Sequence, residues 1–413
     1  MGECKEYDLI IVGAGAAGMT AAVLASGSSL KVALLEKNGQ CGKKLLLTGK
    51  GRCNITNTRP WEELSTHIHP DAAFFRPAFM SFSNTDTIAM FQSLGLPVTV
   101  ERGMRVFPRS GRSMDVRDAL LRRIVSSDNI DLQYNSEVVS IDRITGGFAL
   151  SIMRSDDRIS VRCLQAKAVI IATGGLSYPA TGSTGDGYRL AGRLGHTVTP
   201  TMPSLTALVP EKYNFDLIGL TLRNVSLSLM VDGGVVQTEF GELTFTEGGL
   251  EGALGFRVSR RAVKALTDGK KVEAVIDLKP AVTPAELKAR VEREYRPGVD
   301  LKRFLERFLP LKAVGPFIET VPSLTVQSLP VRLKSWRIPI KDFVDYRRAV
   351  VTAGGVPLKE ISRKTMESKL VPGLYFAGEV MDLDADTGGY NLQIAFSTAA
   401  AAVRSVINRS TLR

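Results

Sequence analysis

The sequence lacks a cysteine framework and has no apolar run long enough to cross a membrane. Only four of its 413 residues are cysteine, which favours a reducing compartment over an oxidising one. No stretch reaches the roughly 20 apolar residues of a transmembrane helix. The first apolar run starts almost at the N-terminus and ends in a glycine turn, which is unlike a signal peptide. These absences predict a cytoplasmic globular protein with no membrane partner.

Histidine is scarcer than cysteine, with three residues in the whole chain. His67 and His69 could suggest a metal site, but two ligands without a cluster of carboxylates or cysteines are insufficient. We therefore predict no metal and interpret these two histidines, and His196, as surface residues.

Acidic residues are fewer than basic ones. The chain has 53 Lys and Arg and 42 Asp and Glu, which give a formal net charge of +11. The basic residues are dispersed, and the pairs Arg122–Arg123, Arg260–Arg261 and Lys270–Lys271 are isolated. This pattern is typical of solvated faces rather than of a nucleic-acid-binding stripe. The charge is compatible with an anionic substrate. We predict a small-molecule substrate and disfavour nucleic acid; the oligomeric state is not defined by the sequence.

What the sequence does contain is a dinucleotide-binding signature at its N-terminus. Leu9 to Val12 is a continuous apolar run, typical of a strand buried on both faces. Glycines at G-x-G-x-x-G spacing follow, and they permit a tight turn, close approach to a pyrophosphate and close helix packing. The N-terminus of the next helix would direct its N–H groups at the phosphates. The candidate pyrophosphate-binding residues are Gly13, Gly15, Ala16, Ala17 and Gly18.

A second predicted strand, residues 31–35, ends at Glu36. An acidic residue at this position accepts hydrogen bonds from the ribose hydroxyls of a dinucleotide. Strand, helix, second strand and terminal Glu36 together predict dinucleotide binding.

A basic loop follows Glu36. Its spacing from Gly42 to Lys50 is too long for a P-loop, and Lys50 precedes Gly51 instead of Ser or Thr. We interpret the loop as a cofactor-binding segment with charge-assisted hydrogen bonds; an ordinary solvated loop is the alternative. Its candidate residues are Lys37, Gly42, Lys43, Lys44, Thr48, Gly51, Arg52, Cys53 and Asn54.

Two later strands also end in glycine turns. Residues 168–172 form a buried strand before Thr173 and Gly174, and residues 374–377 precede Gly378 and Glu379. An alanine-rich C-terminal helix follows Gly388, and its N-terminus is a second anion-stabilising position. We expect these turns at the ligand edge of the same sheet.

Between these segments the sequence contains predicted strands in which apolar and polar residues alternate. We predict a discontinuous nucleotide-binding domain over residues 1–193 and 342–413. The insert, 194–341, reads as barrel-like over about 194–278 and helical over about 279–325. Thr283, Pro284 and Glu286 form a capping box that starts a helix, and residues 113–125 also predict a helix.

Four motifs are more specific than this general pattern. They are Gly51-Arg52-Cys53-Asn54, Ser177-Tyr178-Pro179-Ala180-Thr181-Gly182, Thr365-Met366-Glu367-Ser368-Lys369 and Gly388-Gly389-Tyr390-Asn391-Leu392-Gln393. In their order along nearly the whole chain they resemble the YhiN/BaiN-like flavoproteins, also called the aminoacetone-oxidase-like family. The resemblance implies an α/β fold: a split Rossmann-type FAD-binding domain with an inserted β-barrel and a small helical subdomain. It also implies non-covalently bound FAD.

Site roles follow from the resemblance position by position. Gly13 to Gly18 would face the pyrophosphate, Glu36 the adenosine ribose, and Lys43 with Lys44 the phosphates. The resemblance further implies backbone contact from Val138 to adenine, contact of Asp382 with the ribityl or phosphate side, and a flavin end formed by Gly389, Tyr390, Asn391 and Leu392. The chain departs from many relatives at residues 245–252 and at Ala385, so the substrate is not transferred from the family.

The leading functional hypothesis is a FAD-dependent oxidoreductase of an unidentified small organic substrate, with NAD(P)H as a transient reductant. No catalytic acid or base stands out; Glu247, Arg102, Arg105 and Tyr178 are polar residues beside glycine turns. A non-redox or nucleic-acid-binding flavoprotein is an alternative.

A disulfide reductase is a further alternative that the sequence disfavours. Cys41 and Cys53 lack the spacing of a redox pair, and no second G-x-G-x-x-G is present for a pyridine nucleotide domain. Cys4 precedes the first strand and Cys163 lies far along the chain, so neither is an obvious resolving partner for a redox cysteine.

Overall fold

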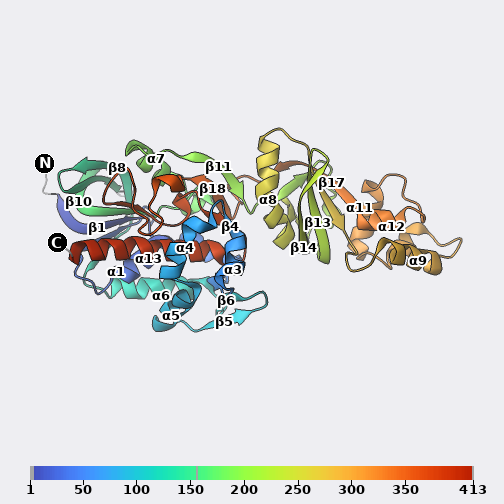
Figure 1. The fold of residues 1–413 in the computed structure, drawn as a ribbon, viewed down its shortest axis with the longest axis horizontal. Helices are drawn as coiled ribbons and strands as arrows, with labels where there is room; N and C mark the ends of the chain where they lie inside the picture. Colours follow the sequence, from blue (N-terminus) through green and yellow to red (C-terminus); the bar gives the residue numbers. More distant parts are fainter. Residues whose placement is uncertain (1–3, 155–156, 412–413) are drawn as a thin grey trace. The chain divides into compact units, whose positions relative to one another are not determined.

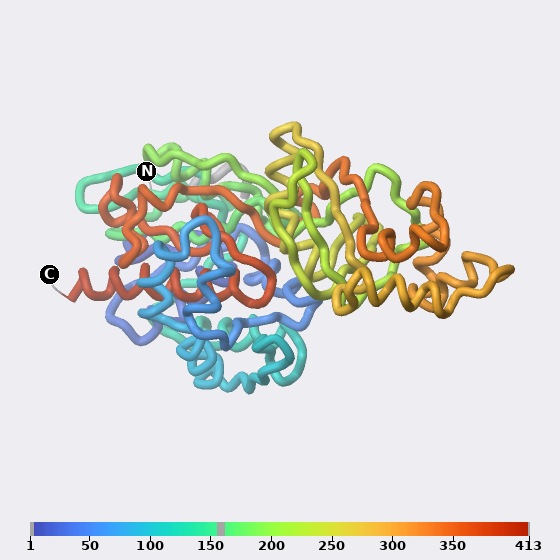
Figure 2. Tube along the Cα trace, turned by 45° about the vertical axis from the view of Figure 1, so that its right-hand side comes forward, coloured from blue at the N-terminus to red at the C-terminus, as the bar shows by residue number. Residues whose placement is uncertain are grey.

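The computed structural model describes residues 4–154 and 157–411, with the side chains of 157–161 left aside. The chain forms two compact units (Figures 1 and 2). Unit 1 comprises Met1–Thr201 and Val351–Arg413, and unit 2 comprises Met202–Val350. The insert expected from the sequence, 194–341, begins and ends slightly earlier in the chain than unit 2.

A seven-stranded sheet forms the centre of unit 1. Leu9 to Val12 of its first strand are all buried, as the apolar run predicts. The strand order is β7-β2-β1-β10-β9-β8, and β19 also pairs with β10. The strands are β1 (Lys5–Val12), β2 (Val32–Leu35), β7 (Ile130–Gln133), β8 (Ser136–Ile144), β9 (Gly147–Arg154), β10 (Asp157–Ile171) and β19 (Leu374–Phe376).

β10 joins two kinds of pairing in one strand. Its first part pairs antiparallel with β9, for example Arg162 with Ile152. Its second part pairs parallel with β1 and with β19. The sequence predicts a separate buried strand over residues 168–172, but this segment continues β10, because residues 164–167 contain no glycine or proline to interrupt the strand.

Helices cover this sheet. α1 and α13 pack on each other, and Figure 1 shows them running along the same side of the sheet. α6 begins and ends where the sequence predicts. The helices are α1 (Ala16–Ala25), α2 (Lys43–Leu47), α3 (Trp61–Leu64), α4 (Ala72–Ser81), α5 (Asn84–Ser93), α6 (Ser113–Val125), α7 (Asp186–Arg193) and α13 (Tyr390–Thr411).

Three small sheets complete unit 1 and its connections. β3, β6 and β5 form an antiparallel sheet, β4 pairs with β20, and β11 pairs with β18. Their bounds are β3 (Thr56–Asn57), β4 (Ile68–His69), β5 (Val98–Glu101), β6 (Arg105–Pro108), β11 (Thr199–Ser204), β18 (Val351–Gly355) and β20 (Asp384–Ala385).

Unit 2 contains a closed six-stranded antiparallel barrel. The strand order is β12-β15-β14-β13-β16-β17, and β17 pairs back with β12. The strands are β12 (Leu208–Pro210), β13 (Thr221–Val231), β14 (Gly234–Thr246), β15 (Gly249–Glu251), β16 (Val272–Asp277) and β17 (Trp336–Phe343). A 16-residue helix, α8 (Gly252–Thr267), follows β15 and was not predicted.

Four short helices fill the segment between β16 and β17. α9 begins with the predicted capping box, in which Thr283 and Glu286 bond reciprocally. Trp336 packs against Phe317 of the helices and Phe245 of the barrel, so both parts share one core. The helices are α9 (Pro284–Glu294), α10 (Leu301–Leu305), α11 (Leu311–Thr320) and α12 (Leu329–Lys334).

Single 3₁₀ turns join several of these elements. They are η1 (Thr48–Gly51), η2 (Ser65–His67), η3 (Pro179–Thr181), η4 (Phe215–Leu217), η5 (Leu358–Glu360) and η6 (Gly378–Val380). None of the described helices is long and apolar enough to span a bilayer.

Candidate functional site

The glycine turn after β1 leaves open space in front of the first turn of α1. A Cβ atom on Gly13 would lie 2.8 Å from the Ala172 carbonyl oxygen, and one on Gly18 would lie 1.8 Å from the Gly13 oxygen. A Cβ on Gly15 would meet no atom within 4 Å. The first N–H groups of a helix have no intrahelical acceptor, so Ala16, Ala17 and Gly18 offer donors beside this space.

Glu36 lies at the end of β2 and is 7% exposed. Its Oε2 accepts a hydrogen bond from the Ala14 amide at 3.0 Å, and its Oε1 accepts one from the Asn38 amide at 2.8 Å. A carboxylate has about four acceptor positions, so Glu36 keeps capacity for a ligand hydroxyl while it is held against the glycine turn.

Three lysines of the basic loop, Lys37, Lys43 and Lys44, already have protein partners. Lys37 Nζ lies 2.5 Å from Asp186, and Lys43 Nζ donates to Asn38 Oδ1 at 2.8 Å. Lys44 Nζ lies 2.7 Å from Glu379, which brings two predicted residues from opposite ends of the chain together.

Residues 48–53 form a tight backbone turn. Thr48 Oγ1 donates to the Leu45 carbonyl at 2.6 Å, and Cys53 is fully buried at a φ of 58°. Arg52 forms an ion pair with Glu101. Gly42 and Gly51 have φ angles of 68° and 83°.

Two predicted residues carry buried oxygen atoms with no hydrogen-bond partner in the part of the chain that the structure describes. They are Asn54 Oδ1 and Thr173 Oγ1. Gly174, with a φ of 73°, follows Thr173 at the end of β10. An unsatisfied buried oxygen costs free energy, so these atoms fit positions that a ligand satisfies.

The backbone of β8 is irregular at the predicted adenine contact. The register of β8 and β9 shifts between Val138 and Ser140, and such a bulge re-aims the backbone. The Val138 carbonyl already accepts a hydrogen bond from Arg189 Nη2 at 3.4 Å.

The end of β19 supplies another glycine turn. Gly378 has a φ of 74°, and its amide donates to Thr398 Oγ1 at 3.0 Å. Glu379 Oε1 accepts from the Thr352 amide at 2.9 Å. Asp382 is half-buried, and its carboxylate has no partner among the residues described.

The N-terminus of α13 is fixed by close backbone contacts. A Cβ on Gly389 would lie 2.6 Å from the Thr56 carbonyl oxygen. Asn391 exchanges two hydrogen bonds with the backbone of Ala385, at 2.9 and 2.7 Å. Tyr390 is buried, and Leu392 is half-buried next to it.

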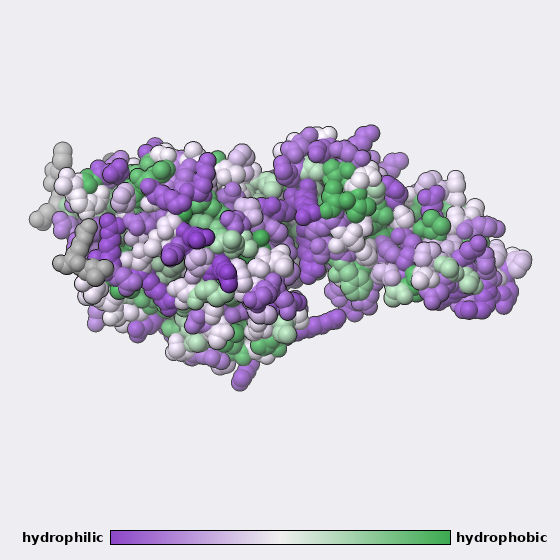
Figure 3. Space-filling view, viewed as in Figure 1, coloured by the Kyte–Doolittle hydropathy of each residue, from purple (hydrophilic) through white to green (hydrophobic). Residues whose placement is uncertain are grey.

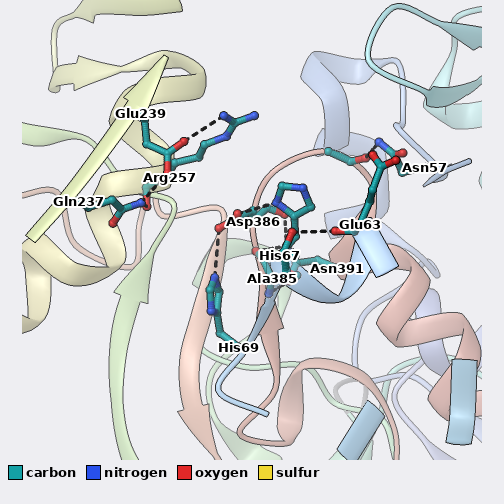
Figure 4. Close-up of polar contacts among 12 residues, drawn as sticks. Asn57, Glu63, His67, His69, Gln237, Glu239, Arg257, Ala385, Asp386 and Asn391 are labelled. Carbon is teal, nitrogen blue, oxygen red and sulfur yellow. Dashed lines mark hydrogen bonds and ion pairs between the residues drawn. The ribbon is translucent and has the colours of Figure 1, made fainter. Parts of the chain in front are cut away.

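The structure places a histidine–carboxylate cluster beside this helix end (Figure 4). His67 Nδ1 lies 2.9 Å from Asp386 Oδ2, and His69 Nε2 lies 3.2 Å from Asp386 Oδ1. The His67 ring stacks on Tyr390, with centroids 4.5 Å apart. Burial alone would raise the pKa of Asp386, but the hydrogen bonds from the two histidines outweigh burial and lower the pKa to about 2.

The interpretation of these histidines as surface residues is therefore wrong. Their side chains are only 21% and 32% exposed. The His-x-His spacing is the only local signal of this cluster, and the partner Asp386 is more than 300 residues away in the chain. Within residues 4–154 and 157–411, no group of three or more His, Cys, Asp or Glu side chains could hold a metal ion.

His196 was also expected at the surface, but it is 5% exposed. Its Nδ1 lies 2.9 Å from Glu360, and its Nε2 lies 2.8 Å from Ser368 Oγ. Burial lowers the pKa of His196, and Glu360 only partly offsets this effect.

The four polar candidates beside glycine turns do not form a common group. Arg102, Arg105 and Glu247 are exposed. Arg105 donates to the Arg102 carbonyl at 3.0 Å. Tyr178 lies in the left-handed region with a φ of 54° and precedes η3.

Cys4 and Cys163 form a disulfide, with Cα atoms 5.0 Å apart. The sequence did not predict this pairing; the parallel register of Lys5 with Leu164 places the two cysteines opposite each other. This pairing removes the cysteine count as an argument for a reducing compartment. Cys41 and Cys53 are free and buried.

Unit 2 has its own polar group on β14 and α8. Glu239 accepts from Arg257 Nη1 at 3.1 Å and from Gln237 Nε2 at 2.9 Å. Arg257 Nε and Gln237 Oε1 are buried, and neither has a partner in the described ranges.

The residues of unit 1 fit a dinucleotide. The carboxyl ends of the parallel strands β1, β2, β10 and β19 carry the glycine turns, and ligands bind at this edge in open α/β sheets. The space in front of Gly15, the unsatisfied atoms of Asn54 and Thr173, and the unpartnered carboxylate of Asp382 are the observations that support the fit.

Comparisons with known proteins agree in fold and family. The model of the family described as HI0933-like protein Rossmann domain matches residues 7–405. The 3-dehydro-bile acid delta(4,6)-reductase of Clostridium scindens is 30% identical over 97% of this chain and 98% of its own length. The ribosomal RNA dihydrouridine synthase of Escherichia coli is 31% identical over 98% of each chain.

A solved structure shows the same fold at low identity. The 3-ketosteroid-delta4-(5alpha)-dehydrogenase of Rhodococcus jostii, in complex with 4-androstene-3,17-dione, is 14% identical over 98% of both chains with a TM-score of 0.55. The fold is a Rossmann-like α/β unit with an inserted six-stranded antiparallel barrel. The chain belongs to the HI0933-like family of FAD-binding Rossmann proteins and is a flavin-dependent oxidoreductase.

Proposed function

We propose that this flavin enzyme reduces a carbon–carbon double bond conjugated to a carbonyl group. The observation that carries the proposal is full-length similarity to two relatives whose names share this chemistry. A 3-oxo compound with a delta-4 double bond and a uracil ring both contain such a conjugated bond. Bound flavin supplies the hydride chemistry, and the protein supplies position and electrostatics.

The proposed cofactor contacts use the turns at the sheet edge. The amides of residues 16–18 bind the pyrophosphate, and Glu36 binds the adenosine ribose. Val138 presents its bulged backbone to adenine, and Asp382 binds the ribityl or phosphate side. Gly389 to Leu392 form the flavin end, where the N-terminus of α13 stabilises negative charge on the reduced ring.

The basic loop and the turns after β10 and β19 belong to the same proposal. Lys43 and Lys44 lie near the phosphates, held by Asn38 and Glu379. The unsatisfied oxygen atoms of Asn54 and Thr173 support direct contact with the cofactor. The remaining residues proposed to surround the cofactor are Lys37, Gly42, Thr48, Gly51, Arg52, Cys53, Gly174, Gly378 and Glu379.

The primary substrate class is a small organic molecule with a conjugated carbonyl. An RNA uridine is a second candidate, favoured by the charge of the helical segment of unit 2. Residues 279–334 contain eleven Lys or Arg and six Asp or Glu. Figure 3 shows hydrophilic residues over much of this segment. A basic surface of this kind supports binding to a polyanion.

NAD(P)H is the proposed electron donor. The sequence has no second G-x-G-x-x-G, so the donor binds transiently rather than in a domain of its own.

The test has two half-reactions. The purified holoprotein is reduced anaerobically by NADH or NADPH, and flavin absorbance is followed. The reduced protein is then mixed with unmodified ribosomal RNA, with a 3-oxo-delta-4 steroid acid, or with the saturated analogue of that acid. We expect one unsaturated acceptor to reoxidise the flavin and gain two hydrogen atoms by mass spectrometry. Reoxidation by none of them would contradict the proposal.

A further inference from the structure

The histidine–carboxylate cluster of unit 1 is held by more contacts than a surface group needs. The Asp386 amide donates to the His67 carbonyl at 3.0 Å, while the Asp386 carboxylate binds the His67 ring. β4 and β20 pair His69 with Asp384. Stacking on Tyr390 fixes the plane of the His67 ring. The two rings and the carboxylate therefore have defined orientations.

The geometry leaves one nitrogen of each ring available. His67 uses Nδ1 for Asp386, so its Nε2 is free of hydrogen-bond partners in the described ranges. His69 uses Nε2, which leaves its Nδ1. Asp386 Oδ2 holds the Nδ1 side of the His67 ring, and histidine is the side chain that most often transfers protons in enzymes. The cluster can therefore hold a proton at His67 Nε2 and release it.

The reaction proposed above needs such a group. When hydride adds to the β-carbon of a conjugated carbonyl compound, the electron pair of the double bond moves toward the α-carbon and the carbonyl. The α-carbon then needs a proton. Of the three histidines, His67 stacks on Tyr390, the residue that the proposed cofactor contacts place at the flavin end.

We propose that His67 Nε2 donates the proton to the α-carbon, and that Asp386 is the positioning residue. The Nε2–H bond breaks and the new C–H bond forms, which leaves His67 as a neutral ring. Solvent then restores the proton, because the His67 side chain is 21% exposed. This inference rests on the proposed reduction for its substrate, but the proton-holding property of the cluster does not.

Several other ionisable groups lie on the segments around the histidine–carboxylate cluster. Arg59 pairs with Glu63, and Asp71 caps α4 by accepting from the Phe74 amide. Asp384 is 1% exposed on β20. With Glu62 of α3 and Tyr390, these are the groups whose titration must be separated from that of His67.

The histidine count makes the direct test simple. The holoprotein is labelled with ¹⁵N-histidine, which yields three imidazoles, and His67→Gln and His69→Gln assign two of them. We expect the ¹⁵N shifts to show a proton on His67 Nε2, and Asp386→Asn to change the His67 signals while the buried His196 signal stays unchanged. A His67 ring without a proton on Nε2, or one that ignores Asp386→Asn, would overturn the inference.

Kinetics test the donor role. His67→Gln replaces the imidazole by a neutral amide, which is too weak an acid to donate the proton. We expect His67→Gln to slow reoxidation of the reduced flavin by the active acceptor at least about a hundredfold, with flavin reduction by NAD(P)H unchanged. The matched control His69→Gln should lose less than about fivefold. Equal losses in both variants would contradict the assignment to His67. Failure of every acceptor with the wild type would instead count against the proposed function, and the ¹⁵N experiment would still decide whether the cluster holds a proton.

Discussion

Glu36 is positioned by the protein itself. The Ala14 and Asn38 amides hold its two oxygen atoms, so the carboxylate does not have to be ordered when a ribose binds. Groups fixed in advance lose less conformational entropy on binding. This single side chain therefore links the end of β2, the glycine turn and the proposed ribose contact.

Glu36→Ala should weaken FAD retention about ten- to a hundredfold. The change removes a charged hydrogen-bond acceptor worth about 1.5–3 kcal/mol. The matched control is Glu6→Ala, an exposed glutamate on β1. FAD affinity, measured by calorimetry on the reconstituted apoprotein, should fall only in Glu36→Ala. Equal affinities in the two variants would refute the ribose contact.

Asp386 should make stability depend on pH in the acid range. Its pKa is lowered from 3.8 to about 2, so its stabilisation is present above pH 3.8 and is lost as pH falls toward 2. Asp386→Asn should cost about 2 kcal/mol at pH 7. Urea unfolding should show this difference shrinking as pH falls below 4. A difference that grows on acidification would contradict the hydrogen-bonded carboxylate.

Turnover should not need Cys41 or Cys53. Burial raises the pKa of Cys41 to about 11 and that of Cys53 to about 12, so neither thiol forms the reactive thiolate at neutral pH. Cys41→Ser combined with Cys53→Ser should leave both flavin half-reactions within about tenfold of the wild type, about 1.4 kcal/mol. Stopped-flow absorbance measures both. A thiolate-to-flavin charge-transfer band in the wild type would favour a disulfide reductase.

At the level of elements, α1 depends on one glycine. A Cβ on Gly18 would lie 1.8 Å from the Gly13 carbonyl oxygen, so Gly18→Ala must displace α1 or the turn. We expect a loss of about 1–3 kcal/mol in unfolding free energy, with loss of FAD. Gly192→Ala on α7 is the control, because its Cβ meets no atom within 4 Å. It should be neutral or stabilising by up to about 1 kcal/mol.

Elements with strong local signals could be predicted from the sequence. The acidic start of α6 and the capping box of α9 locate both helices. α8 could not be predicted, because Gly252 and Gly255 near its start read as turn residues. Gly252 does turn the chain, with a φ of 80°, but Gly255 allows close packing: a Cβ there would lie 2.7 Å from the Leu250 carbonyl oxygen.

The candidate site, too, could be predicted only where its residues are close together in the sequence. Gly13 to Gly18 and Glu36 form one local βαβ pattern, and local patterns are visible in sequence. The pairs Lys44–Glu379 and His67–Asp386 join segments more than 300 residues apart. Only the tertiary fold brings them together, so no spacing rule could find them.

At the scale of the whole molecule, the excess positive charge should strengthen the binding of a polyanion. Lys302 and Arg303 are exposed on α10, with no ion-pair partner in the described ranges. Lys302→Glu combined with Arg303→Glu should weaken RNA binding and reduce the salt slope by about 1–2. The exposed pair Lys270 and Lys271, changed the same way, is the control. Filter binding at several salt concentrations measures both. Equal effects would indicate attraction by net charge alone.

The two chain passages that lead to and from unit 2 run side by side. In unit 1, a Cβ on Gly354 would lie 2.4 Å from the Pro200 carbonyl oxygen, and in unit 2 the Val350 amide donates to Leu205. An insertion whose two ends lie side by side can be replaced as one piece. Evolution can lengthen, reshape or exchange it without reopening the sheet of the host domain. One flavin-binding domain can thereby acquire new substrates while its cofactor contacts stay the same.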